Sequence, residues 1–175
     1  QMLAYVSIPF YFQDVLGRDA VATGLLITPW PVAAAVMAPI AGRLADRYPA
    51  GILGALGLGL FAAGLGLLAW LPASPGDANI VWRMALCGAG FGLFQSPNNR
   101  AIITAAPLSR SGGAGGMLGT ARLVGQTVGA ALVPLMFGAF GARATIWALG
   151  IGAGIALLAA AVSSTRLIEA GGAKS

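Results

Sequence analysis

Long stretches of mostly apolar residues, separated by short connections, run through this chain from end to end. A helix that crosses a bilayer needs roughly 20 such residues. The hydropathy pattern predicts a partial span from residue 1 to about 16, then full spans at about 22–44, 50–71, 80–106, 113–140 and 144–163. A soluble core built from 175 residues could not hide this much apolar surface. The bilayer is therefore the predicted solvent of these helices.

The predicted fold is an all-α membrane protein, a six-helix transmembrane bundle over residues 1–165. Composition agrees with it, since 58% of the residues are hydrophobic and only 9% are charged, whereas ordinary soluble domains carry roughly a quarter charged residues. The first helix begins inside an apolar stretch at Gln1, so we expect it to be truncated at its N-terminus. Residues 166–175 are expected to form a short cytoplasmic tail.

The side chains on which most enzymes and metal sites depend are scarce in this chain. Histidine is absent and Cys87 is the single cysteine, so no histidine base, intrachain disulfide or thiolate cluster can form. The net charge of +5 comes from Lys and Arg residues that are scattered singly, without the basic stripe of a nucleic-acid binder. We therefore expect no enzyme, metal, cofactor or nucleic-acid partner.

Proline and glycine lie inside the predicted spans and not only between them. Pro29, Pro31 and Pro39 are expected to kink the second span without breaking it, because neighbouring helices re-satisfy the backbone. Small residues at four-residue spacing let helices approach closely. Such pairs are Gly88 and Gly92, Gly115 and Gly119, Gly125 and Gly129, and Gly150 and Gly154. Their density at 113–140 predicts tight packing of that span.

The basic residues of the connections predict the orientation of the bundle, because Lys and Arg are retained on the cytoplasmic side. One alternate set of connections carries Arg43, Arg47, Arg110, Arg166 and Lys174, and the other carries Arg18, Arg83 and Arg143. The bias is modest. It predicts that the connection at 43–47 and the C-terminus are cytoplasmic in a multi-pass protein of the cell membrane.

Polar residues inside the predicted spans are concentrated at 80–106 and 113–140, whereas the spans at 50–71 and 144–163 are apolar. Gln95, Asn98 and Asn99 share one helix face by their spacing, and so do Arg122 and Gln126. Intramembrane polar groups are costly and usually face a cavity or a partner helix. They either line a substrate path or hold the bundle together through interhelical hydrogen bonds. On the first interpretation Phe91, Phe94 and Trp30 supply the apolar wall of a substrate site.

Two motifs resemble those of a known family. The segment Gly42-Arg43-Leu-Ala-Asp46-Arg47 resembles the loop signature of the major facilitator superfamily. The stretches from Gly88 to Arg100 and from Ser111 to Gly129 look like late helices of its fourteen-helix drug:proton antiporter branch, the EmrB/QacA type. This resemblance covers nearly the whole chain and makes it the C-terminal half, with the N-terminal half missing.

The resemblance implies export of drugs or other hydrophobic or cationic small molecules from a bacterial cell, coupled to proton entry through the inner membrane. It also implies that Gly42, Arg43, Asp46 and Arg47 form a gating loop held by charge pairs; the alternative is that the two arginines only set topology. The carboxylates of Asp14, Asp19, Asp77 and Glu169 lie at the ends of predicted spans and that of Asp46 lies in a connection, so we expect the titrating group in the missing half. The alternative function is a channel or a structural membrane module without coupled transport.

Overall fold

The computed structural model describes residues 1–172, except for the side chains of Leu108 and of residues 166–172. The described elements are α1 (Met2–Phe10), the π-helical turn η1 (Tyr11–Val15), α2 (Ala20–Ile27), α3 (Pro29–Leu44), α4 (Ala50–Ala69), α5 (Asp77–Thr104), the 3-10 turn η2 (Leu108–Arg110), α6 (Ser111–Phe140), the 3-10 turn η3 (Gly141–Arg143) and α7 (Ala144–Gly172). Residues 1–172 contain no strand. The all-α prediction is therefore confirmed, with α1 and η1 forming the partial first span and α2 and α3 the second.

The second span is one helix with a kink at its prolines. Thr28 separates α2 from α3 but keeps helical dihedral angles of −51° and −36°. Its N–H donates to the carbonyl of Gly24 at 3.0 Å, and its own carbonyl accepts from Val32 at 3.2 Å. Pro29 and Pro31 have no N–H to continue the ladder between these bonds. The chain therefore bends here and the helical path continues, as the sequence predicts.

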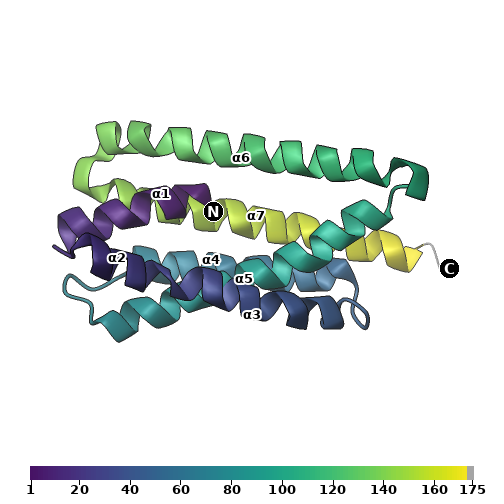
Figure 1. The fold of residues 1–175 in the computed structure, drawn as a ribbon, viewed down its shortest axis with the longest axis horizontal. Coiled ribbons are helices and arrows are strands. Elements are labelled where there is room, and N and C mark those ends of the chain that lie inside the picture. The colour runs from purple at the N-terminus through teal and green to yellow at the C-terminus, as the bar shows by residue number, and fades with distance from the viewer. Residues whose placement is uncertain (173–175) are drawn as a thin grey trace.

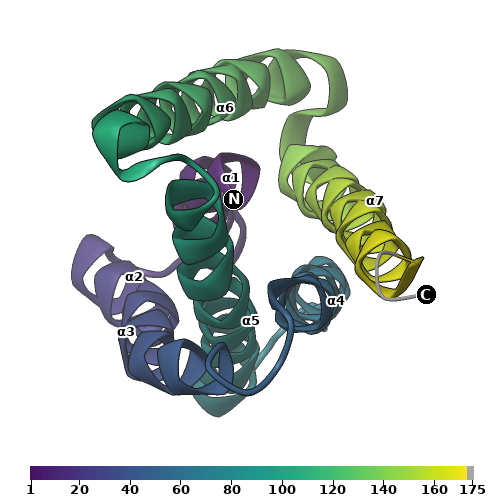
Figure 2. The ribbon, with the colours of Figure 1, turned by 90° about the vertical axis from the view of Figure 1, so that its right-hand side faces the viewer.

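The helices run lengthwise, with α5 between α3 and α4, and α7 against the other side of α4 (Figures 1 and 2). The connections from η1 to α2, from α4 to α5 and from α6 to α7 lie at one end of the bundle. The connections from α3 to α4 and from α5 to α6, and the end of α7, lie at the other end. The two predicted sets of basic connections therefore occupy opposite ends of the molecule.

Three described segments are long and apolar enough to cross a membrane, namely Ala20–Leu44, Ala50–Ala69 and Ser111–Thr165, the last covering both α6 and part of α7. Helix α5 is not among them, although the sequence predicts a span there. Arg83, Gln95 and Asn98 are among the polar side chains that lower its hydropathy. A helix of this polarity is suited to the middle of a bundle, which is where α5 lies (Figure 2).

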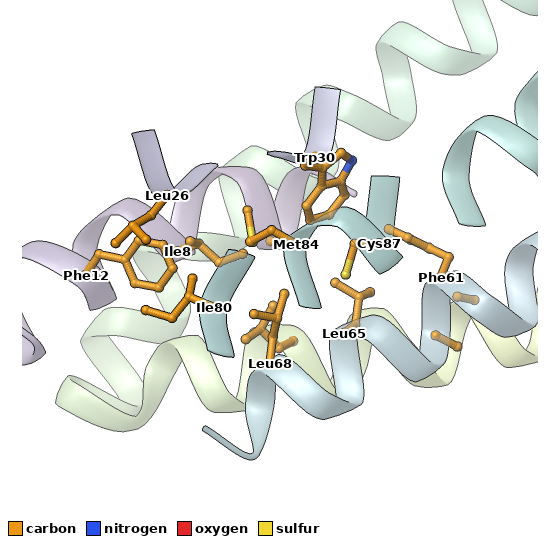
Figure 3. Packing of buried hydrophobic residues seen from close by; sticks show 14 residues of the cluster. Ile8, Phe12, Leu26, Trp30, Phe61, Leu65, Leu68, Ile80, Met84 and Cys87 are labelled. Carbon is orange, nitrogen blue, oxygen red and sulfur yellow. The ribbon is translucent and has the colours of Figure 1, made fainter. Parts of the chain in front are cut away.

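The main core lies where α1, α3, α4 and α5 meet (Figure 3). Trp30 of α3 is 1% exposed and packs edge-on against Phe61 of α4, with ring centroids 5.5 Å apart. Leu65 and Cys87, both fully buried, fill the space between α4 and α5. These contacts fix the position of α5 relative to α3 and α4.

Glycines bring α4 and α5 into backbone contact. A methyl group added at Gly57 of α4 would lie 2.5 Å from the backbone nitrogen of Phe94, and one added at Gly90 would lie 2.8 Å from the carbonyl oxygen of Gly57. Neither position has room for a side chain. One face of α4 is therefore packed into the bundle, and its opposite face, with Leu56 and Leu60, is exposed.

Helix α6 differs from the sequence prediction of tight packing. No atom lies within 4 Å of a methyl group placed at Gly115, Gly119 or Gly125. The helix is held mainly through its C-terminal part, where Val133 and Met136 are buried. Its preceding turns stand away from α5 (Figure 2). Of the predicted glycine pairs of this span, only Gly129 packs closely, since an added methyl group there would lie 3.0 Å from Cβ of Met2 in α1.

Helix α7 continues to Gly172, past residue 165 where the sequence places the start of a tail. Residues 173–175, including Lys174, lie outside the described residues. Within the described part of α7, Ala148 and Leu149 are buried near its start and Ser163 donates to the carbonyl of Gly51 at 3.2 Å. This bond joins α7 to the first turn of α4.

Candidate functional site

A cavity of about 350 Å³ lies between the C-terminal half of α5 and the middle of α6. Its lining residues are Gln1, Met2, Phe91, Phe94, Gln95, Asn98, Asn99, Leu118, Ala121, Arg122, Gly125 and Gln126. The cavity contains six of the seven side chains that the sequence assigns to a substrate site, namely Phe91, Phe94, Gln95, Asn98, Arg122 and Gln126. These residues come from two helices, with Gln1 and Met2 at the start of the chain completing the wall.

Helical spacing explains how the lining is assembled. Phe91, Gln95 and Asn98 are four and three residues apart, so they form one stripe along α5. Arg122 and Gln126 are four apart and form a matching stripe on α6. The two stripes face each other because α6 contacts the rest of the bundle mainly at its other end. The cavity therefore exists where α5 and α6 diverge.

Arg122 supplies the positive charge of this cavity. Its side chain is exposed, whereas Gln95, Asn98 and Gln126 are half-buried. Among the described residues it forms no ion pair, and no described Asp or Glu lines the cavity. The site consequently offers guanidinium donors, side-chain amides that both donate and accept, and two aromatic walls.

Trp30 lies outside this cavity. Its ring packs against Tyr5, with centroids 4.8 Å apart, and against Phe61, and it is 1% exposed. Its indole nitrogen has no hydrogen-bond partner among the described residues. The sequence interpretation assigns Trp30 to the apolar wall of the substrate site, whereas in the structure its ring lies in the core.

A second hollow of about 340 Å³ adjoins the cavity between α3 and α5. Its floor is made of small residues, Ala34, Ala35, Ala38 and Gly92, and it shares Gln95 and Asn99 with the cavity. The sequence interpretation assigned none of these alanines to the site. The available signal was the run Ala33–Ala35 inside a predicted span, since a run of small side chains leaves space beside a neighbouring helix.

The predicted gating loop lies at the end of the bundle where α3 passes into α4. Asp46 Oδ1 accepts from Arg100 Nη1 of α5 at 2.6 Å. Arg43 and Arg47 are exposed and form no ion pair among the described residues. Gly42 lies on α3, where an added methyl group would be 4.0 Å from Ser96 Oγ. The pairing partner of Asp46 is thus on another helix and not within the loop.

The described carboxylates all lie at helix ends. Asp19 caps α2 by accepting from the N–H of Ala22 at 2.7 Å, and Asp77 pairs with Arg18 at 2.5 Å at the first turn of α5. Asp14 lies in η1 and Asp46 in the loop after α3. The described residues also contain no group of three or more metal-ligating side chains. Glu169 belongs to the part of α7 whose side chains are not described.

The model of the family described as Major Facilitator Superfamily matches residues 1–170. The chain belongs to the major facilitator superfamily. It is 63% identical over 169 residues to the uncharacterized transporter YebQ of Escherichia coli. The aligned residues make up 97% of this chain and 37% of that protein. It is 32% identical over 123 residues to the multidrug resistance protein Stp of Mycobacterium tuberculosis, covering 70% of this chain and 23% of that protein.

A third relative is the riboflavin transporter RibZ of Clostridioides difficile, 28% identical over 137 residues, which are 78% of this chain and 30% of that protein. The chain thus spans well under half the length of these relatives. Two of these relatives are named as transporters and one as a multidrug resistance protein.

Proposed function

We propose that this chain is the C-terminal six-helix half of a proton-coupled exporter of drugs or other hydrophobic small molecules, in the fourteen-helix antiporter branch of the family. The observation that carries the proposal is the cavity between α5 and α6, where polar and aromatic side chains of two helices converge. A site of this kind surrounds a small molecule with apolar surface and orients it with a few polar groups. The relative named as a multidrug resistance protein supports the substrate class.

In the proposed mechanism Arg122, Gln126, Gln95 and Asn98 hydrogen-bond the substrate while Phe91 and Phe94 contact its apolar part. The remaining half of the protein would complete the opposite wall, and the two halves would rock around the site to expose it to each side in turn. The exposed inner face of α6 fits this arrangement, because it leaves room for a helix of the other half.

Proton coupling needs a titratable group that changes its exposure during transport. The described carboxylates lie at helix ends, and two of them are already paired with arginines. We therefore place the titrating carboxylate in the missing N-terminal half. The gating role proposed for Gly42, Arg43, Asp46 and Arg47 is carried by Asp46, whose ion pair with Arg100 could form in one conformation and open in the other.

We propose a bacterial inner-membrane location in which the end of the bundle with Arg43, Arg47 and Arg110 is cytoplasmic, as is the C-terminus. The cavity then lies nearer the cytoplasmic end of the bundle than the opposite end. Asn98 is six residues, about 9 Å along the helix, from the end of α5, which this orientation places at the cytoplasmic side. An exporter loads its substrate from that side.

The test is energy-dependent efflux from cells that lack their own exporters. The complete protein is expressed, cells are loaded with a fluorescent dye, and efflux is followed with and without a protonophore. Efflux that stops with the protonophore supports antiport. Efflux that ignores it contradicts proton coupling, and passive equilibration in both directions would favour a channel. A structural module without transport would leave dye retention equal to that of cells without the protein.

A further inference from the structure

We propose that the cavity between α5 and α6 selects neutral or anionic aromatic compounds and disfavours cations, with Arg122 as the residue that sets this charge preference. The inference rests on the proposed transport function and narrows its substrate class. The sequence resemblance includes cationic compounds among the substrates, and the composition of the cavity argues against them.

The charge around the cavity is one-sided among the described residues. Arg122 lines it, and no described acid does. Asp77, beside Arg18, and Asp46, beside Arg100, have their own cationic partners. Asp14 and Asp19 lie at the far end of the bundle, by the connection between η1 and α2. No described group is therefore placed to neutralise the guanidinium in the cavity.

A single unpaired charge is enough to discriminate between ligands. At about 8 Å, a unit charge changes the local concentration of a monovalent ion about two-fold in a water-like medium, and the factor grows as the dielectric constant falls. Near the guanidinium, the local concentration of an anion rises and that of a cation falls. A substrate that carries both signs would bind with its acceptor side toward α6.

The hydrogen-bonding groups favour the same class of compound. A guanidinium only donates, so Arg122 requires carbonyl, carboxylate or similar acceptors on the ligand. The amides of Gln95 and Gln126 accept as well as donate, which suits a ring system with mixed polar edges. Phe91 and Phe94 provide faces against which such a ring can pack.

The neighbouring hollow adds a constraint on shape. It opens beside Gln95 and Asn99 and is floored by Ala34, Ala35, Ala38 and Gly92. Gly92 is itself packed, since an added methyl group would lie 2.8 Å from the carbonyl oxygen of Ala34. The small side chains of this lining leave room for a second, small apolar part of the ligand. The expected substrate is an aromatic compound with acceptor groups on one edge.

The charge preference is tested on the complete protein with Leu118→Cys. Leu118 lines the cavity one helical turn before Arg122, so the new thiol lies close to the guanidinium without replacing a proposed ligand. The thiolate attacks a methanethiosulfonate reagent, a disulfide forms, and sulfinate leaves. Rates are measured with the anionic sulfonatoethyl and the cationic trimethylammonium-ethyl reagents, each corrected for its rate with a free thiol. Cys87 is fully buried, and its background is measured in the parent protein.

We expect the anionic reagent to be favoured, and the ratio of rates to fall about five-fold when Arg122→Gln is added, because the two reagents respond in opposite directions. Arg122→Lys is the matched control and keeps the ratio. If the ratio of rates is the same with Leu118→Cys alone as with Leu118→Cys and Arg122→Gln together, the inference is overturned, because Arg122 would then not set the charge of the cavity.

Transport of two probes separates this inference from the proposed function. Fluorescein and rhodamine 6G share a ring frame and carry opposite charge. Preferential export of fluorescein supports the inference, and preferential export of rhodamine 6G overturns it while leaving an exporter. If neither probe nor any other dye is exported, the proposed function fails, and the reagent ratio still decides whether the cavity selects by charge.

Discussion

Arg100 Nη1 lies 2.6 Å from Asp46 Oδ1, joining the loop between α3 and α4 to the end of α5 across 54 positions of sequence. The side chains are 58% and 61% exposed, so water screens the pair. Exposed ion pairs of this kind contribute about 0–1 kcal/mol to stability. An interaction this weak can be broken and remade during a transport cycle, which fits a conformational role better than a structural one.

Asp46→Asn is expected to impair export and leave the protein folded. The substitution keeps the size of the side chain and removes the charge that Arg100 contacts. The free energy of unfolding in detergent is expected to change by no more than about 1 kcal/mol. The initial rate of dye efflux is expected to fall severalfold. The charge-swapped pair Asp46→Arg with Arg100→Asp is expected to recover part of the rate.

The control lies at the opposite end of the same helix. Asp77 pairs with Arg18 at 2.5 Å outside the predicted gating loop; Asp77 is about as exposed as Asp46, and Arg18 is less exposed than Arg100. Asp77→Asn is expected to leave efflux close to that of the parent. Equal loss of transport in Asp46→Asn and Asp77→Asn would mean that both pairs merely hold α5 in place.

Gly57→Ala is expected to destabilise the bundle, because its new methyl group would meet the backbone nitrogen of Phe94 at 2.5 Å. Backbone on both sides leaves no flexible group to move, and overpacking of this kind costs about 1–3 kcal/mol. Gly59, on the same helix, has nothing within 4 Å of an added methyl group. Gly59→Ala is expected to be neutral or to gain up to about 1 kcal/mol from helix propensity. Thermal unfolding of the two variants measures the difference.

Trp30→Ala is expected to act on folding, since the ring is 1% exposed and packs against Tyr5 and Phe61. Truncation of a buried tryptophan costs about 3–5 kcal/mol, so the yield of folded protein falls. Phe94→Ala, in the wall of the cavity, is expected to keep the yield and lower transport. Yield is read from size-exclusion profiles in detergent. A folded, transport-dead Trp30→Ala protein would instead place the ring in the substrate path.

Periodicity in the sequence was sufficient to place the helices and to group the site. The predicted span at 50–71 became α4 (Ala50–Ala69), and the polar stripes of 80–106 and 113–140 meet in one cavity. The position of α4 and the grouping of each polar stripe follow from patterns within a single helix, which hydropathy and side-chain polarity record directly. What lies on one helix face could therefore be predicted.

Relations between helices could not be predicted in the same way. Trp30 turned into the core because its direction depends on how far α3 rotates against α4, and no local pattern encodes that rotation. The predicted glycine pairs of α6 carry the same spacing as Gly88 and Gly92 of α5, yet of the four α6 glycines in these pairs only Gly129 has a neighbour within 4 Å of an added methyl group. The partner of Asp46 was also not predicted, because the pair joins α5 to a loop 54 residues away in the sequence.

Cysteines placed at the two ends of α6 are expected to react from opposite sides of the membrane. Ser109 and Ala142 are exposed in the connections that precede and follow this helix. With an impermeant maleimide added to intact cells, Ala142→Cys is expected to be labelled and Ser109→Cys only after lysis, because basic connections are retained in the cytoplasm. The buried Cys87 contributes little background. The reverse pattern would invert the proposed orientation and move the cavity toward the outer surface.

Arg122→Ala is expected to abolish most efflux while the protein still reaches the membrane. The side chain is exposed and forms no ion pair among the described residues, so its removal leaves no described partner charge buried. Removing a positioned charged donor from a binding site costs about 1.5–3 kcal/mol, equivalent to roughly ten- to hundredfold in affinity. Efflux rates at several dye concentrations, normalised to membrane abundance, measure that loss. Unchanged transport would show that Arg122 does not bind the substrate and only contributes to packing in the complete protein.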